Sequence, residues 1–257
     1  MTSVFRYELK IRKKVKKALK KQHDFLVENG EWLYNNVFAW YFSRYKTLDG
    51  IEKWYASLDD FFKQMGIYEM IREISDDIKK VVQVGHKTNY RLHKQDMVKF
   101  GISFNVNNPA VNQYMRDFEA LQLSDREGSI SLTTKNNVIA ELRKWVEENL
   151  SYTQVAKNIQ ALDQTLFSFN RAKLIAVRET WLAYEYGNYI PMREVSQQWA
   201  KVQKKRSTVH DDRVTATCRA NEAQWWLEID EKWQSWDDLP PRDTNPRCRC
   251  TWLRQVE

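Results

Sequence analysis

Apolar residues recur at helical spacing over the first twenty residues of the chain, and most positions between them are basic. A period near 3.6 residues places such side chains on one face of a helix. The pattern therefore predicts an amphipathic helix over residues 1–21, with Thr2 or Ser3 as its N-cap. The apolar face of this helix would carry Val4, Leu9, Ile11, Val15, Ala18 and Leu19.

The following segment, residues 24–100, is rich in aromatic side chains that recur with the same period. We interpret these side chains as hydrophobic core, because an apolar stripe at helical spacing normally faces the interior. Gly85 and Gly101 bracket a less regular stretch. The periodicity predicts helices near residues 24–45, 50–65 and 67–84.

Capping residues mark the helix starts in the middle of the chain. Asn108 followed by Pro109 predicts a helix over 109–122, preceded by a short strand or an irregular entry at 102–108. Thr134 can cap a helix over 135–149. Ser151 and Gln154 form a capping box for a short helix over 152–162.

The last long helix is predicted over residues 170–186, with Gly187 as its C-cap. Beyond Pro191 the helical period is lost, and residues 203–217 are polar. We therefore expect this tail to consist of loops with short strands.

Glycine and proline are scarce, with seven and five residues respectively. Sheets joined by tight turns need these residues at the turns, which disfavours a β-sandwich, β-barrel or β-propeller. The predicted fold class is mainly α (α+β overall), with a helical N-terminal half and a C-terminal helical domain closed by a loop-rich tail with short strands. The expected divisions are a basic helix (1–22), an aromatic-rich helical domain (23–130) and a C-terminal domain (131–257).

The apolar runs of the chain are short, and the longest is VFAWYF at 37–42. A membrane-spanning helix needs about 20 apolar residues, so no membrane partner is expected. The three cysteines are an odd number, which argues against a disulfide framework and favours a reducing cytosol or a particle assembled there.

Positive charge is concentrated at the N-terminus. Residues 1–21 carry a net charge of +8, which leaves −1 for the rest of a chain whose formal net charge is +7. A basic amphipathic helix can contact DNA phosphates, an acidic protein surface or a membrane, or it can simply be a solvated face. The candidate residues for binding DNA or an acidic partner are Lys10, Arg12, Lys13, Lys14, Lys16, Lys17, Lys20 and Lys21.

The familiar catalytic motifs do not occur. The sequence has no Gly-rich phosphate loop, no HExxH, no GxSxG and no CxxC. We therefore expect a non-enzymatic protein without a cofactor, apart from a structural zinc ion considered below.

The second half of the chain contains four segments in a distinctive order. These segments are LSYTQVAKNI (150–159), NRAKLIAVRETWLAYEYGN (170–188), HDDRVTATCRA (210–220) and NPRCRC (245–250). Their order resembles the phage head-morphogenesis family, the Mu F-like minor head (minor capsid) proteins. The residues that match the family's helix, central segment and terminal motif are Arg171, Ala172, Ile175, Ala176, Arg178, Glu179, Ala183, Gly187, Asp211, Asp212, Arg213, Val214, Cys248, Arg249 and Cys250.

The cysteines allow three interpretations. Cys248 and Cys250, two residues apart, would project to one face of an extended segment. With Cys218 and His210 they could form a tetrahedral zinc site. They could equally be small buried hydrophobic side chains, or Cys218 could form a disulfide with one of the other two.

The charged residues of the matched motifs predict an ionic network that ties the helix 170–186 to the tail. Buried charges persist only when they are paired and hydrogen-bonded. The alternative is a set of separate surface pairs, each contributing little to stability. The expected network comprises Arg178, Glu179, Asp212, Arg213 and Arg249.

The resemblance implies a minor virion protein, associated with the portal, that acts in capsid assembly or in DNA packaging and delivery. It implies a place in the capsid interior or at the portal vertex, with assembly in the cytoplasm of a bacterial host. The partners would be the portal protein, with the major capsid or scaffolding protein and double-stranded DNA as further possibilities, and several copies per particle. The alternatives are a DNA-binding protein that uses the basic helix and, less favoured, a metal-dependent enzyme or toxin-like domain.

Overall fold

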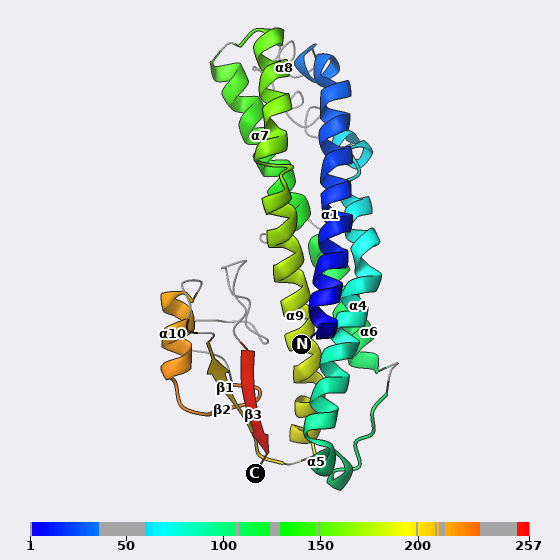
Figure 1. Ribbon diagram of the computed structural model, residues 1–257, viewed down its shortest axis with the longest axis vertical. Coiled ribbons are helices and arrows are strands. Elements are labelled where there is room, and N and C mark those ends of the chain that lie inside the picture. Colours follow the sequence, from blue (N-terminus) through cyan, green and yellow to red (C-terminus); the bar gives the residue numbers. More distant parts are fainter. Residues whose placement is uncertain are drawn as a thin grey trace, which may run out of the picture. The chain divides into compact units, whose positions relative to one another are not determined.

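The computed structural model is mainly helical and contains one small sheet, which confirms the predicted fold class (Figure 1). The long helices are α1 (Thr2–Glu28), α4 (Ile67–Leu92) and α9 (Phe169–Ser196). The structure describes residues 2–35, 60–105, 108–123, 129–148, 150–198, 200–208, 210, 214–231 and 251–256.

The shorter elements complete the order along the chain. The helices are α5 (Lys94–Lys99), α6 (Pro109–Gln122), α7 (Ile130–Glu147), α8 (Tyr152–Ala161), the 3₁₀ turn η1 (Leu162–Gln164) and α10 (Ala216–Ala223). The strands are β1 (Val202–Ser207), β2 (Leu227–Glu228) and β3 (Thr251–Val256). None of the helices described here is both long enough and apolar enough to span a bilayer.

The chain forms two compact units, and each combines segments that are distant in sequence. Unit 1 comprises residues 1–12, 76–116 and 174–257, and unit 2 comprises residues 13–75 and 117–173. These units differ from the three consecutive segments expected from the sequence, because α1, α4 and α9 each contribute residues to both.

The first helix is longer than predicted. α1 begins at Thr2 and ends at Glu28, so Thr2 and Ser3 lie within the helix and neither is its N-cap. Its predicted apolar face is confirmed at Val4, Ile11 and the positions that follow at helical spacing, whereas Leu9 is exposed. Because the apolar face of α1 is buried, this helix is part of the core and not a detachable basic arm.

Two predicted caps are confirmed and one is wrong. The Ala110 N–H donates to Asn108 Oδ1 at 2.8 Å in front of Pro109, and Ser151 forms a capping box with Gln154. Thr134 is not a cap, because α7 begins four residues earlier. At the start of α7, Ser129 Oγ accepts a hydrogen bond from the Leu132 N–H at 2.9 Å. The Thr134 hydroxyl instead donates to the Ile130 carbonyl within the helix.

The glycines of unit 1 have another role than the one predicted. Gly187 does not end α9, which continues through Pro191 to Ser196, and Gly85 lies inside α4. The two helices cross here with their backbones in contact. A Cβ at Gly85 would overlap the Tyr184 carbonyl oxygen, and one at Gly187 would overlap the Val82 carbonyl oxygen. Only a residue without a side chain fits at this crossing.

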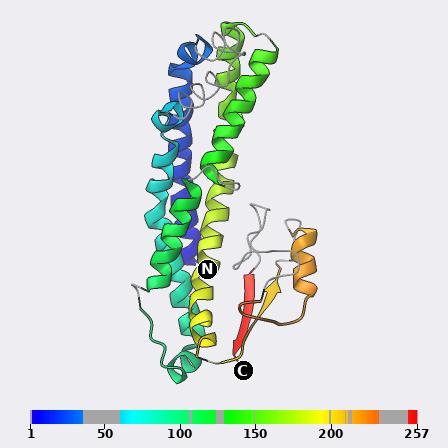
Figure 2. The same cartoon turned by 180° about the vertical axis from the view of Figure 1, so that it is seen from behind.

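The segment predicted to be a polar loop contains the central strand of the sheet. β1 pairs antiparallel with β2 on one side and with β3 on the other. The strands β1 and β3 lie beside the C-terminal part of α9 (Figure 1, Figure 2). An apolar cluster that includes Tyr189, Met192, Val202 and Ile229 joins the sheet to α9.

Unit 2 is assembled around the rest of α1. The Arg171 guanidinium donates to Thr134 Oγ1 at 2.7 Å and to the Leu166 carbonyl at 2.8 Å, and burial lowers the pKa of Arg171 to about 10. His23 Nε2 lies 3.0 Å from the Ile159 carbonyl oxygen, which joins α1 to α8. The helix predicted near residues 24–45 is present as far as residue 35, and most of the one near 50–65 lies outside the described residues.

Candidate functional site

The inner face of the sheet carries basic side chains. Along β1 the buried positions alternate with partly exposed ones, and they are Val202, Lys204 and Arg206. In the antiparallel register Lys204 lies opposite Arg254 of β3. Two cations therefore occupy adjacent buried positions, where they need counter-charges or hydrogen-bond acceptors.

Arg254 receives its counter-charge from α9. Its Nη2 lies 3.1 Å from Glu185 Oε2, and the two side chains are only 5% and 8% exposed. Burial lowers the pKa of Arg254, and the Glu185 carboxylate opposes that effect. This ion pair joins the last strand of the chain to the long helix.

Lys204 is satisfied by backbone acceptors. Its Nζ donates to the Ile229 carbonyl at 2.8 Å and to the Glu231 carbonyl, and burial lowers its pKa to about 8. The Tyr189 hydroxyl donates to Asp230 Oδ1 at 2.7 Å, so α9 and β1 both hold the turn that follows β2. Because its hydrogen bonds go to a turn of the fold, we assign Lys204 a structural role.

Two members of the predicted ionic network lie close together. Arg178 Nη1 lies 3.7 Å from Glu179 Oε1, and the Glu179 side chain is buried. The other expected members, Asp212, Arg213 and Arg249, lie outside the described residues, so the network as a whole remains a prediction. The described link between α9 and the tail uses Glu185 and Arg254 instead.

The proposed zinc ligands are only partly described. Cys218 is buried in α10, and its backbone N–H donates to the N-cap Thr215 Oγ1. His210 is 76% exposed, and its Nε2 lies 3.3 Å from Glu222 Oε1. Burial alone would raise the pKa of Glu222, but hydrogen bonds from Thr208 and the nearby His210 lower it.

Cys248 and Cys250 lie outside the part of the chain that the structure describes. Within that part, no three His, Cys, Asp or Glu side chains are grouped as a metal site would require. The zinc, disulfide and buried-thiol interpretations therefore remain open.

The predicted basic residues of α1 fall into two groups. Some are engaged in the fold: Lys10 Nζ lies 2.7 Å from Asp77 Oδ1, and Lys14 Nζ donates to the Glu73 carbonyl at 2.6 Å. The hydrogen bond to Asp77 raises the pKa of Lys10. Lys20 pairs with Asp24 on the same helix at 3.0 Å.

The other group, to which Lys20 also belongs because its pair with Asp24 lies at the surface, presents its side chains to solvent. Lys13, Lys17, Lys20 and Lys21 are exposed, as is Arg6 nearer the N-terminus. Arg12 is half-buried, and Lys16 lies 5.4 Å from the ring centroid of Phe169. Spacings of three and four residues place Lys13, Lys17 and Lys20 on one helix face, which forms a basic stripe.

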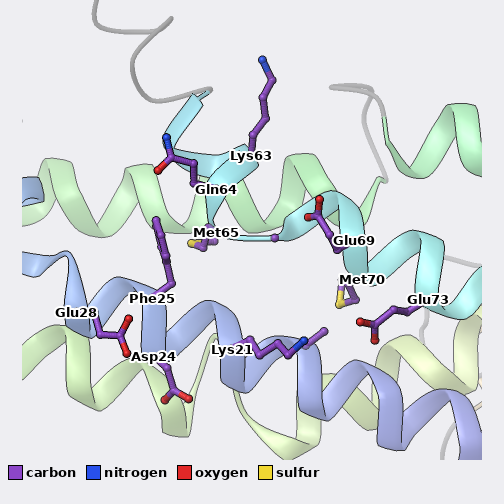
Figure 3. A pocket seen from close by; sticks show the side chains of 12 residues that line it. Lys21, Asp24, Phe25, Glu28, Lys63, Gln64, Met65, Glu69, Met70 and Glu73 are labelled. Carbon is purple, nitrogen blue, oxygen red and sulfur yellow. The ribbon is translucent and has the colours of Figure 1, made fainter.

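A pocket of about 560 Å³ lies in unit 2 beside α1 (Figure 3). Its apolar lining includes Phe25, Met65 and Met70. The charged side chains that line it are Lys21, Asp24, Glu28, Lys63, Glu69 and Glu73, four carboxylates and two ammonium groups. The periodicity of the sequence does not reveal this pocket, because its two walls are far apart along the chain.

No known family, curated protein or solved structure matches this chain. Of the residues described here, sequence reasoning missed Glu185, Lys204 and Arg254. The sequence gives no signal for Lys204, because Val202–Ser207 has a single apolar residue and its burial alternates only in the folded sheet.

Proposed function

We propose that this chain is a minor head protein that acts, without catalysis, in phage capsid assembly or in DNA packaging and delivery, next to the portal. The ordered motifs that end in Cys248, Arg249 and Cys250 carry the proposal. The strand β3 begins directly after that motif, and its Arg254 pairs with Glu185 of α9, the helix that contains the matched residues from Arg171 to Gly187.

This contact supports the proposal, because a terminal motif can act together with the helix only if the tail folds back onto it. The buried Arg254–Glu185 pair forms such a contact between the tail and α9, and both residues belong to unit 1. The familiar catalytic motifs do not occur in the sequence, which supports a role in assembly over one in catalysis.

The test is to purify DNA-filled heads from the phage that encodes the chain and to identify their proteins by mass spectrometry. The proposal predicts that the chain is present and that it can be cross-linked to the portal protein. Arg254→Ala should lower its incorporation, whereas Leu253→Ala, at an exposed position of the same strand, should not. Heads that lack the chain altogether would refute the proposal.

A second candidate function is DNA binding by the basic stripe of α1. The exposure of Lys13, Lys17, Lys20 and Lys21 favours it, since ammonium groups that reach solvent can reach phosphates. Deletion of residues 1–21 cannot test it, because the deletion would also remove buried core residues such as Ile11 and Leu19.

Substitution of the four lysines by glutamine is the appropriate test. If each lysine contacts a phosphate, the plot of the logarithm of the binding constant against the logarithm of salt concentration should become less steep, with the magnitude of its slope reduced by up to about 4. The matched control replaces four exposed lysines elsewhere, Lys94, Lys99, Lys157 and Lys173, by glutamine. Equal loss of DNA affinity in both variants would mean that only net charge matters, and absence of binding by the parent protein at low salt would exclude this function.

A further inference from the structure

The N-terminal turns of α1 expose apolar side chains as well as basic ones. Phe5 is 37% and Leu9 is 46% exposed, and their i, i+4 spacing places them on one face of the helix. The exposed residues Arg6 and Lys13 flank them. An exposed apolar pair with basic neighbours is typical of a helix face that binds an apolar groove with an acidic rim.

The pocket in unit 2 has the complementary properties. Met65 and Met70 are buried beneath it, and methionine side chains adapt readily to an incoming apolar group. Figure 3 shows Glu28 and Glu73 at opposite ends of the pocket, with Lys21 between them. Within the described residues, the carboxylates of Glu28 and Glu73 form no hydrogen bond or ion pair.

The charges of the two surfaces are opposite. Four carboxylates and two ammonium groups give the pocket lining a net charge of −2, whereas Arg6 and Lys13 add positive charge on either side of Leu9. A volume of about 560 Å³ is ample for one or two apolar side chains, since pockets of about 300–1,000 Å³ hold whole small ligands.

We propose that the N-terminal face of α1, centred on Phe5 and Leu9, binds the methionine-lined acidic pocket of a second copy of this chain. Phe5 and Leu9 occupy the pocket above Met65 and Met70, while Arg6 and Lys13 pair with the carboxylates of the rim. The two surfaces are different parts of the chain, so the contact is head-to-tail and leaves one surface of each copy available for another copy. The inference is independent of the virion role.

Charge reversal provides the test. Glu28→Lys with Glu73→Lys reverses the net charge of the pocket lining, and Arg6→Glu with Lys13→Glu reverses the charge of the helix face. The full-length protein should self-associate in sedimentation equilibrium, and each reversed variant should associate at least about tenfold more weakly. An equimolar mixture of the two variants should regain association, because each then meets an opposite charge. The control is Glu148→Lys with Asp163→Lys, which changes the net charge by the same amount as the pocket variant but at exposed positions outside the pocket.

A second measurement needs no substitution. A carbodiimide joins amines directly to carboxylates, so the parent protein, mixed from ¹⁴N and ¹⁵N preparations, should yield intermolecular cross-links from Lys13 to Glu28, Glu69 or Glu73. A protein that remains monomeric at all concentrations would overturn the proposal. Self-association that is unaffected by pocket reversal, or that the control variant weakens equally, would also overturn it.

Discussion

The crossing of α4 and α9 gives a sharp prediction about stability. Gly187→Ala adds a Cβ that would overlap the Val82 carbonyl oxygen and would lie 2.9 Å from the His86 backbone nitrogen, whereas ordinary contacts begin at 3.4 Å. Both obstacles are backbone atoms of α4, which no change of rotamer can move. To relieve the closer contact, with the Val82 carbonyl oxygen, the two helices must separate locally by at least about 1 Å.

The expected cost follows from this separation. A gap of about 1 Å removes up to about half of the dispersion energy of each contact across it. Overpacking of this kind costs about 1–3 kcal/mol, and sometimes more when backbone must move. Alanine is favoured over glycine inside a helix by about 1 kcal/mol, which offsets part of the loss. We expect a net destabilisation of about 2 kcal/mol.

The measurement is urea unfolding followed by circular dichroism, with the midpoint and the m-value compared between variants. Gly30→Ala is the matched control, because its new Cβ would meet only the flexible end of Ile159, at 3.2 Å. This control should be neutral or slightly stabilising. If Gly187→Ala is as stable as Gly30→Ala, the contact between the two backbones does not limit the packing of these helices.

Three further predictions concern buried polar groups. Burial lowers the pKa of His86 to about 4 from 6.5, and neither ring nitrogen has a hydrogen-bond partner among the described residues. As the pH falls, the imidazole of the unfolded chain therefore takes up its proton at a higher pH than His86 of the folded chain does. The free energy of unfolding should fall by about 3 kcal/mol between pH 6.5 and about pH 4. His86→Phe should flatten this part of a plot of unfolding free energy against pH, and an unchanged slope would contradict the assignment. Glu185→Ala should destabilise by about 3–5 kcal/mol by leaving Arg254 buried without its counter-charge, while the double variant Glu185→Leu/Arg254→Met should recover most of that loss in the same unfolding assay. Metal analysis of the purified protein should find close to one zinc per chain if Cys218, Cys248, Cys250 and His210 are ligands, and a negligible amount would exclude that site.

Local patterns predicted much of the secondary structure. The apolar period of α1 predicted a helix, and the caps at Asn108 and Ser151 predicted where two helices start. Each of these patterns depends on residues within one or two turns. The scarcity of glycine and proline correctly indicated a helical fold with little sheet. The same reasoning failed at Gly187, since a glycine that ends a helix and a glycine that admits another backbone look alike in one sequence.

The functional candidates divide in the same way. The basic character of α1 is legible in the sequence, but the fold decides that Lys10 is held by Asp77 whereas Lys13 and Lys17 reach solvent. The acidic pocket joins residues from α1 and α4 that are about 40 positions apart, so no local pattern could reveal it.

The sequence by itself determined where helices form and where charge accumulates, because helix propensity, capping and amphipathic period are properties of neighbouring residues. Only the tertiary structure decided which of those charges are buried and with which partner. Lys204 lies in a polar segment that looks solvated, and Arg254 lies in the terminal segment, yet pairing of β1 with β3 turns both side chains inward, toward the turn after β2 and toward Glu185. That outcome depends on contacts between residues up to 69 positions apart, which a reading of adjacent residues cannot supply.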